Sequence, residues 1–405
     1  MSATSDPTGK PLPWGASWVD PRLAIDRVIA TDSGPAILIL AIVAGVAQAV
    51  AQTLAFTTIG ALRDWRIVLG SVLLGVVSGM ISLYVQAPFL GWTARLFGGH
   101  APISNVRAAV AWGAVPLAIG LSIGLIIFGL LGLAGAMDGS KFVQMLTGLV
   151  TILYVWALVT TIAMFAQVES FGISRALACF VLWLLAGLAA QVAIRTFLYQ
   201  PFSIPSGAMM PTLLVGDHLL LSKYTYGYSR YSLPFSLPLF AGRKFASDPD
   251  RGDLVVFRLP KDPSTDYVKR VVGLPSERIQ MINGVLHING IAVRRERIED
   301  FIDTEDNGRQ VRIKQWRETL PNGVSYRTLD LIDNGFYDNT KEYRVPAGHY
   351  FMMGDNRDNS TDSRVESAVG YVPLENLVGR AQIIYFSIDW TSRLLRSDRL
   401  GLVVR

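Results

Sequence analysis

Five long apolar runs in the first half of the chain constrain its fold more than any other feature. Each is about 20 residues long, the length that an α-helix needs to cross the hydrocarbon core of a bilayer. Their only charged residue is Arg195, which lies near the end of the last run and can reach the lipid headgroups. The runs are Pro35–Phe56, Ile67–Pro88, Ala114–Met137, Phe142–Ala166 and Ala176–Phe197. We therefore predict a membrane protein with an N-terminal α-helical bundle of about five transmembrane helices.

The charged residues concentrate after the last apolar run. The whole chain is 51% hydrophobic and 17% charged, which is more apolar than an ordinary soluble protein. The uneven distribution predicts domains of different solvent class. We expect a cytoplasmic N-terminal segment at 1–33, a helical transmembrane domain at 34–197 and an extracytoplasmic β-rich domain at 198–405.

The orientation follows from lysine and arginine in the loops, which favour the cytoplasmic side. With a cytoplasmic N-terminus, six of these residues lie inside and three outside. The six are Lys10, Arg22, Arg27, Arg95, Arg107 and Arg175, and the three are Arg63, Arg66 and Lys141. An odd number of spans then places the polar domain on the extracytoplasmic side.

Several classes of function are excluded by composition. The net charge of +5 comes without a lysine- and arginine-rich stretch interleaved with aromatics, so no nucleic-acid partner is expected. The single cysteine, Cys179, rules out an intrachain disulfide and a Cys/His zinc site, and we expect no metal and no cofactor. The polar start of the chain lacks the pattern of a cleaved signal, so the first apolar run is expected to stay in the membrane.

The polar half has the pattern of a mostly-β domain. Alternating runs at Asp253–Leu259 and Asp266–Val272 are typical of strands, and Met281–Val293 is expected to form a hairpin. Four Asn-Gly pairs favour tight turns, at positions 283–284, 289–290, 322–323 and 334–335. The charge-rich stretch from about Glu299 to Glu318 is expected to form loops and a hairpin.

Four short blocks in this half carry a family signature. The first is FSIPSGAMMPTL at 202–213, followed by Gly216-Asp217; the others are RGDLVVF at 251–257, DYVKRVVGLP at 266–275 and MGDNRDNSTDSR at 353–364. In order and spacing they resemble the type I signal peptidases, the Ser/Lys endopeptidases that remove signal peptides from exported proteins. The resemblance covers roughly residues 200 to 390.

The resemblance implies roles for four positions. Position 208 is that of the nucleophilic serine, Lys269 is the general base, Ser360 orients the lysine amine, and Ser206 helps to bind the oxyanion together with backbone N–H near 208. The chemistry requires a neutral amine, because a serine hydroxyl attacks only when a base removes its proton. The strand neighbours of Lys269 on the same face, Tyr267 and Val271, are an apolar setting that disfavours the ammonium form.

Further residues are assigned supporting roles. Asp355, Arg357, Asp362 and Arg364 are expected to form a buried polar scaffold for the loop that carries Ser360, although a solvated turn would have the same composition. Gly207 and Gly354 fit places where the backbone approaches closely or turns sharply. The substrate is expected as an added strand cleaved after Ala-X-Ala-type sites. Candidate pocket residues, which are equally candidates for ordinary core, are Ile204, Met209, Met210, Leu213 and Leu214.

Position 208 departs from the family pattern because it is alanine, Ala208. Three explanations remain open: a serine replaced to trap an inactive enzyme, a natural pseudoenzyme that still binds signal peptides, or Ser206 as the nucleophile. The resemblance implies a serine endopeptidase of the bacterial inner membrane, present here in an inactive form, with its catalytic domain on the periplasmic face. Expected partners are signal peptides of exported preproteins, the lipid bilayer and the secretion machinery. The alternatives are a signal-peptide receptor or membrane chaperone without catalysis, and a self-cleaving Ser/Lys repressor-like protein, which five spans argue against.

The membrane half is similar to Yip-family helical membrane domains. It has a polar start, an amphipathic lead-in around Trp18–Ile29, and spans that we expect to be broken by Pro88 and Pro116. In the second span, Ser71, Gly75 and Gly79 recur every fourth residue, which favours close approach of another helix, although small residues also accumulate there by chance. The resemblance implies a role in positioning substrates or organising a complex.

Overall fold

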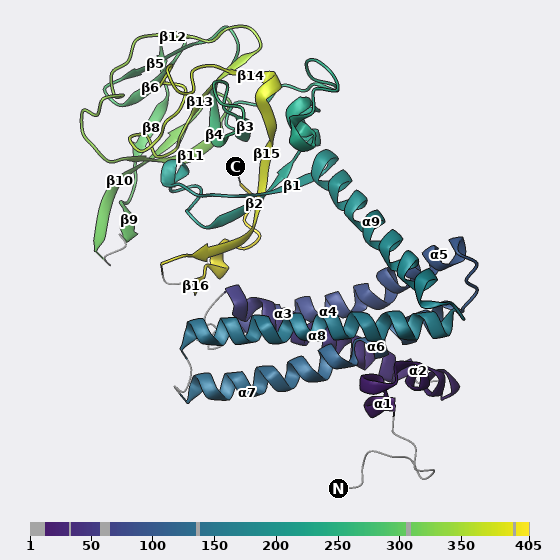
Figure 1. Ribbon diagram of the computed structural model, residues 1–405. Helices are drawn as coiled ribbons and strands as arrows, with labels where there is room; N and C mark the ends of the chain where they lie inside the picture. The colour runs from purple at the N-terminus through teal and green to yellow at the C-terminus, as the bar shows by residue number, and fades with distance from the viewer. Residues whose placement is uncertain are drawn as a thin grey trace. The chain divides into compact units, whose positions relative to one another are not determined.

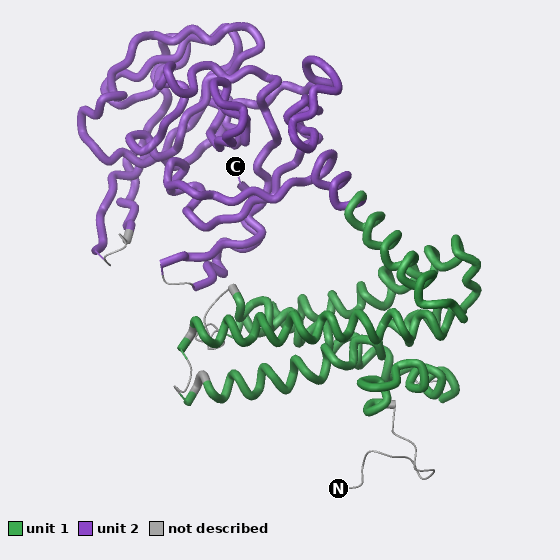
Figure 2. The backbone as a smooth tube through the Cα atoms, viewed as in Figure 1, with its two compact units in different colours: residues 1–189 green, residues 190–405 purple. Residues whose placement is uncertain are grey.

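The computed structural model describes residues 13–31, 34–56, 65–134, 138–304, 309–391 and 394–404. The chain forms two compact units, Met1–Ala189 and Ala190–Arg405 (Figure 2). Apolar helices make up the first unit and antiparallel strands dominate the second (Figure 1), so the predicted fold class is confirmed. The border between the units falls inside helix α9, Ile173–Phe197. The domain limits expected at 33 and 197 stay a prediction.

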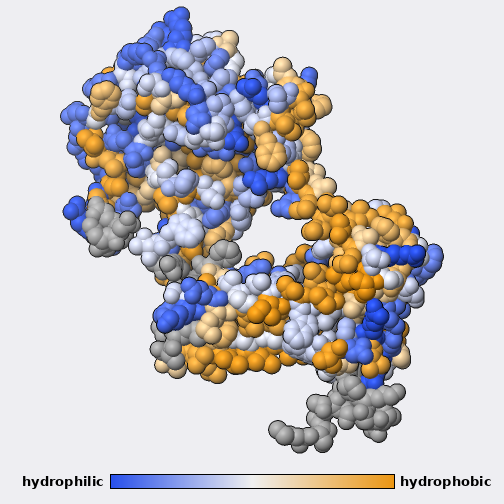
Figure 3. Space-filling model, in the orientation of Figure 1, coloured by the Kyte–Doolittle hydropathy of each residue, from blue (hydrophilic) through white to orange (hydrophobic). Residues whose placement is uncertain are grey.

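Among the described residues, five helical segments are long and apolar enough to span a membrane, and the chain is a membrane protein. Four lie in unit 1, and the fifth crosses the border into unit 2. The five segments are Gly34–Ala55, Trp65–Leu96, Ile103–Leu131, Ser140–Val168 and Ile173–Phe197. The helices are α1 (Pro13–Val19), α2 (Pro21–Ala30), α3 (Gly34–Phe56), α4 (Trp65–Ile81), α5 (Ala87–Leu96), α6 (Ile103–Gly113), α7 (Leu121–Leu133) and α8 (Gly139–Val168). Apolar side chains dominate their visible surface (Figure 3), as a lipid-facing surface requires.

The third span begins at Ile103, earlier than the expected Ala114, and its expected end at 135–137 lies outside the described residues. Neither Pro88 nor Pro116 breaks its span, contrary to our expectation. The helical path continues through π-helical turns, η2 (Ser82–Gln86) before Pro88 and η3 (Pro116–Gly120) at Pro116. A proline lacks the N–H that a helix interior needs and clashes with the carbonyl four residues earlier, and a wider turn relieves that clash.

Helices α3 and α4 pack with their backbones in close contact, as the small residues of α4 suggested. A Cβ on Gly75 would overlap Cα of Val46, and one on Gly79 would overlap the carbonyl oxygen of Ala41. One turn earlier, the hydroxyls of Ser71 and Thr53 are 2.8 Å apart. Larger side chains at these glycines would force the two helices apart.

Unit 2 is built on one large antiparallel sheet with the order β1-β2-β15-β3-β4-β13-β14, and β16 pairs with β15. Its two faces pack on separate apolar clusters, one around Leu219, Leu221 and Val256 and one around Val255, Val271 and Met352. The strands are β1 (Tyr199–Ser203), β2 (Asp217–Ser222), β3 (Leu254–Arg258), β4 (Asp266–Gly273), β13 (His349–Met353), β14 (Val372–Pro373), β15 (Leu377–Asp389) and β16 (Leu394–Leu395).

Two smaller sheets complete unit 2. The predicted hairpin at Met281–Val293 is present as β5 (Arg278–Ile282), β6 (Val285–Ile288) and β7 (Ile291–Ala292), and β12 (Tyr343–Arg344) pairs with β5. Its first turn has positive φ at both Asn283 and Gly284, the geometry that twisted hairpins need. The charge-rich stretch forms a hairpin of β9 (Phe301–Thr304) and β10 (Gln310–Thr319), which also pairs with β8 (Arg294–Arg297) and β11 (Ser325–Asp330). Residues 305–308 lie outside the described part.

Candidate active site

Position 208 lies in a short turn that the fourth sequence block fixes from across the unit. Strand β1 ends at Ser203, and Ala208 occupies the 3₁₀ turn η4 (Gly207–Met209). The Asn356 backbone N–H donates to the Ala208 carbonyl at 3.2 Å, and its Nδ2 donates to the Gly207 carbonyl at 3.1 Å. Asn356 was not among the residues singled out from the sequence, although it lies inside the fourth block. These bonds position the backbone that would carry a nucleophile.

Gly354 brings position 208 and Ser360 to the same point. A Cβ on Gly354 would overlap Oγ of Ser360 and would lie 2.6 Å from the Ala208 carbonyl oxygen. Since no side chain fits there, glycine is required for close approach rather than for an unusual φ. The structure therefore places Ser360 beside the turn that carries Ala208, about 150 residues earlier in the chain.

Lys269 lies on β4, between β3 and β13, and is 4% exposed. Burial lowers the pKa of its amine to about 8, although the charges of Asp362 and Asp355 act in the opposite direction. Its Nζ lies 5.4 Å from the ring centroid of Tyr267. Within the described part of the chain, neither this Nζ nor the buried Oγ of Ser360 has a hydrogen-bond partner. Both side chains are buried, at 4% and 8% exposed, so neither polar group is compensated by bulk water.

The carboxylate of Asp355 joins three of the sequence blocks. It accepts two hydrogen bonds from Arg270 of β4, at 2.8 and 2.7 Å, and a third from the Thr212 hydroxyl of the first block at 2.5 Å. Asp355 is 1% exposed and Arg270 is fully buried, so each charge depends on the other for stabilisation. The loop after β13 is thereby tied both to β4 and to the segment that follows position 208.

Three other charged residues of the fourth block, Arg357, Asp362 and Arg364, are also buried and paired. Arg357 pairs with Glu318 of β10. Asp362 pairs with Arg364 at 2.8 Å and accepts from the Gly354 N–H at 3.0 Å. Burial alone would raise the pKa of Asp362, but Arg364 holds it below its usual value. These pairs make the loop of Ser360 a buried polar scaffold, not a solvated turn.

Sequence reasoning missed Arg270, Glu318 and Tyr326, which complete this network. Arg270 is fully buried, and its guanidinium lies 4.1 Å from the ring centroid of Tyr326. The alternation of side chains along β4 could have revealed Arg270, because the residue after Lys269 faces the opposite side of the sheet and a second apolar core. A buried arginine needs an ionic partner. Its partner Asp355 lies 85 residues away in the chain, so the pair is not visible from local pattern.

Ser206 and the candidate pocket residues lie apart from this network. Ser206 is exposed at the start of η4, and no hydrogen bond joins it to Lys269 in the described structure. Ile204, Met209 and Leu213 are buried in the apolar cluster beneath β2, and Met210 and Leu214 are half-buried. That placement agrees with ordinary core, so a role in lining substrate pockets stays a prediction.

Known proteins resemble both halves of the chain. Residues 174–386 match the family described as signal peptidase, peptidase S26, and residues 15–194 match the Yip1 domain. The signal peptidase I of Rickettsia typhi is 46% identical over 213 residues, which are 50% of this chain and 78% of the relative. That of Rickettsia conorii is 45% identical over the same length. These matches confirm both resemblances inferred from the sequence.

A solved structure of a signal peptidase I from Enterococcus faecalis V583 is 25% identical and covers 33% of this chain and 97% of that chain. Its TM-score of 0.20 is too low for a comparison of geometry.

Proposed function

Because this chain belongs to the signal peptidase family, peptidase S26, we propose that it binds signal peptides of exported preproteins and cleaves them when position 208 is serine. The observation that carries the proposal is the buried amine of Lys269, with a lowered pKa and no hydrogen-bond partner among the described residues. A structural lysine would be paired or would extend into solvent. With a pKa of about 8, roughly a tenth of the Lys269 amines are neutral at pH 7, and this fraction can accept a proton.

The proposed reaction is an acyl transfer to a serine. The neutral Lys269 amine removes the proton from the serine hydroxyl that the change Ala208→Ser restores, and the serine oxygen attacks the scissile carbonyl. Ser206 and the backbone N–H at 208 stabilise the oxyanion, and Ser360 orients the amine. The protonated lysine then protonates the leaving amine, and water hydrolyses the acyl-enzyme by the same route.

The chain as given is proposed to be an inactive form, because the Ala208 methyl group cannot attack a carbonyl. Binding does not require that oxygen, so an uncut signal peptide should remain bound. A bound, uncut signal peptide is expected both for a trapped enzyme and for a natural receptor. Ser206 as the nucleophile has less support, since it is exposed and no hydrogen bond connects it to Lys269 in the described structure.

The cellular location and the membrane topology follow from the same proposal. We place the chain in a bacterial inner membrane with residues 198–405 on the extracytoplasmic face, where exported chains emerge, and residues 1–33 in the cytoplasm. The secretion machinery is the proposed source of substrates. The Yip1-like half would position those substrates or organise the complex.

The test compares the chain as given with its Ala208→Ser form on one preprotein in liposomes, with any new N-terminus mapped by mass spectrometry. We expect cleavage after a small residue by the serine form and a turnover about six orders of magnitude lower for the alanine form. Cleavage by the alanine form that disappears in Ser206→Ala would make Ser206 the nucleophile. A folded, peptide-binding serine form that does not cleave would favour the receptor.

A further inference from the structure

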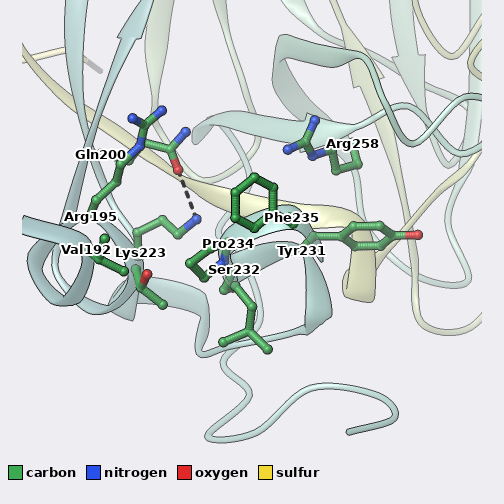
Figure 4. Close-up of a pocket in the computed structure, with 11 residues that line it drawn as sticks. Val192, Arg195, Gln200, Lys223, Tyr231, Ser232, Pro234, Phe235 and Arg258 are labelled. Atoms are coloured by element: carbon green, nitrogen blue, oxygen red, sulfur yellow. Dashed lines mark hydrogen bonds between the residues drawn. The ribbon is translucent and has the colours of Figure 1, made fainter. Parts of the chain in front are cut away.

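A cavity of about 370 Å³ lies in unit 2 where the last apolar helix ends. It shares no residue with the candidate active site. The last two turns of α9 supply Val192, Arg195 and Thr196, and the loop after the short turn at Arg230–Ser232 supplies Leu233, Pro234 and Phe235. Gln200 of β1, Lys223 after β2 and Arg258 of β3 complete the polar part of its wall (Figure 4).

Three cations face this cavity with one carboxylate near them. Arg258 pairs with Asp266, whose Oδ1 lies 3.2 Å from its Nε. Lys223 is 2% exposed and donates to the neutral Oε1 of Gln200 at 3.0 Å. Arg195 has no ionic or hydrogen-bond partner in the part of the chain that the structure describes. The cavity therefore carries an excess of positive charge.

This charge arrangement is costly without an anion. Burial is the largest influence on the Lys223 amine and lowers its pKa to about 8; Asp266 opposes that effect, while Arg258, Arg243 and Arg195 add to it. A buried cation that is not paired with a carboxylate is rare in a protein that uses the site only for structure. A bound anion would supply the missing charge.

The rim of the cavity is apolar and exposed. Phe235 lines the cavity and is 97% exposed (Figure 4). The same loop also exposes Leu239 and Phe245. Arg195 lies two residues before the end of the span, about 3 Å along the helix axis, so its long side chain can reach the headgroups. A ligand here meets cations beside an apolar surface.

We propose that this cavity binds the phosphate of an anionic phospholipid, with Arg195, Lys223 and Arg258 around the headgroup and the Phe235 loop against the acyl chains. Soluble phosphates share the headgroup chemistry, but the exposed apolar rim and the helix end favour a lipid. The lipid would hold unit 2 at the membrane through its headgroup. This site goes beyond the proposed peptidase, and its test requires neither cleavage nor a signal peptide.

The test uses the full chain in detergent and counts retained lipid by native mass spectrometry. We expect phosphatidylglycerol to be retained in preference to zwitterionic phosphatidylcholine. Arg195→Gln should lower phosphatidylglycerol retention about fivefold, the effect of one cation on anionic-lipid binding. Because Arg195 has no partner among the described residues, this variant should fold, and an unchanged melting temperature checks that it does.

Lys244→Gln is the matched control. Lys244 is an exposed cation of the same loop region that does not line the cavity, so its loss tests general attraction to anionic lipid. We expect its retention to match that of the unchanged chain. Equal retention by Arg195→Gln, or an equal loss in Lys244→Gln, would overturn the proposal. Inorganic phosphate that binds as tightly as phosphatidylglycerol, in an Arg195-dependent way, would also overturn it in favour of a soluble ligand.

Discussion

At the scale of single residues, the buried amine of Lys269 has the largest chemical consequence. An ordinary lysine with a pKa of about 10.4 is neutral in well under a thousandth of molecules at pH 7. With its pKa at about 8, Lys269 is neutral in roughly a tenth of them. Burial thus raises the population of the basic form by about two orders of magnitude. Its acidic neighbours Asp362 and Asp355 reduce that gain but do not reverse it.

The first prediction concerns the pH dependence of the serine-restored protein. The pKa of Lys269 is lowered to about 8 in the folded protein. The neutral fraction of its amine therefore increases as the pH rises, and deprotonation is nearly complete above about pH 9. We expect kcat/KM of Ala208→Ser to rise about tenfold per pH unit below pH 8 and to level off above it. A peptide-cleavage assay over this range measures the profile.

Two lysine variants separate this role from a general effect of charge. Ala208→Ser combined with Lys269→Ala should bind peptide and not cleave it. Lys223 is the matched control because burial also lowers its pKa to about 8. Ala208→Ser combined with Lys223→Met should show the same dependence of kcat/KM on pH as Ala208→Ser alone. A flat profile, or cleavage that survives in Lys269→Ala, would assign the base to another residue.

The sequence singled out the candidate reactive positions more readily than the residues that support them. Position 208, Lys269 and Ser360 stand in short blocks whose residue order is distinctive. Arg270 and Glu318 act through partners that folding brings from distant strands, and no local pattern reveals such pairs. The candidate pocket residues show the opposite problem, since an apolar side chain after a strand fits a pocket and a core equally well.

At the scale of elements, the number of spans was predictable because lipid demands about 20 apolar residues from each. The start of the third span was not predictable in this way, because α6 contains Arg107. Its Nε donates to the Leu83 carbonyl at 3.1 Å, and its guanidinium lies 4.7 Å from the centroid of the Tyr84 ring. A search for uncharged runs excludes any segment with an arginine, even one whose guanidinium is paired within the protein, so it placed the start of the third span after Arg107.

The contact between α3 and α4 supports a stability prediction. Gly75→Leu should destabilise the full chain by about 3 kcal/mol, because its Cβ would already overlap the α3 backbone. Gly148→Leu is the control, since no atom lies within 4 Å of a Cβ at that position of α8. Thermal unfolding of both variants in detergent measures the difference. Equal melting temperatures would show that the helices separate without cost.

At the scale of the whole molecule, the chain joins a Yip1-like membrane unit to a peptidase unit. We predict that a reporter fused after Arg405 is extracytoplasmic, because the five spans follow an N-terminus that we propose to be cytoplasmic. Reporter activity in intact cells, compared with a fusion after residue 170, measures the topology. The fusion after residue 170, which follows four spans, should report the cytoplasm. A cytoplasmic reporter after Arg405 would separate the peptidase from exported substrates and contradict its proposed function.

The position of β15 in the sheet has a consequence for biosynthesis. This strand lies between β2 and β3 but is made of residues 377–389, so a growing chain holds both neighbours long before it can pair them. Until that segment emerges from the ribosome, Leu221 and Val256 lack the Ala381 surface on which they pack. Such non-local pairing is slow and comes late. The large sheet of unit 2 can therefore close only after residues 377–389 have been translated, so β1 and β2 wait for most of the chain before they join β3 and β4 in one sheet.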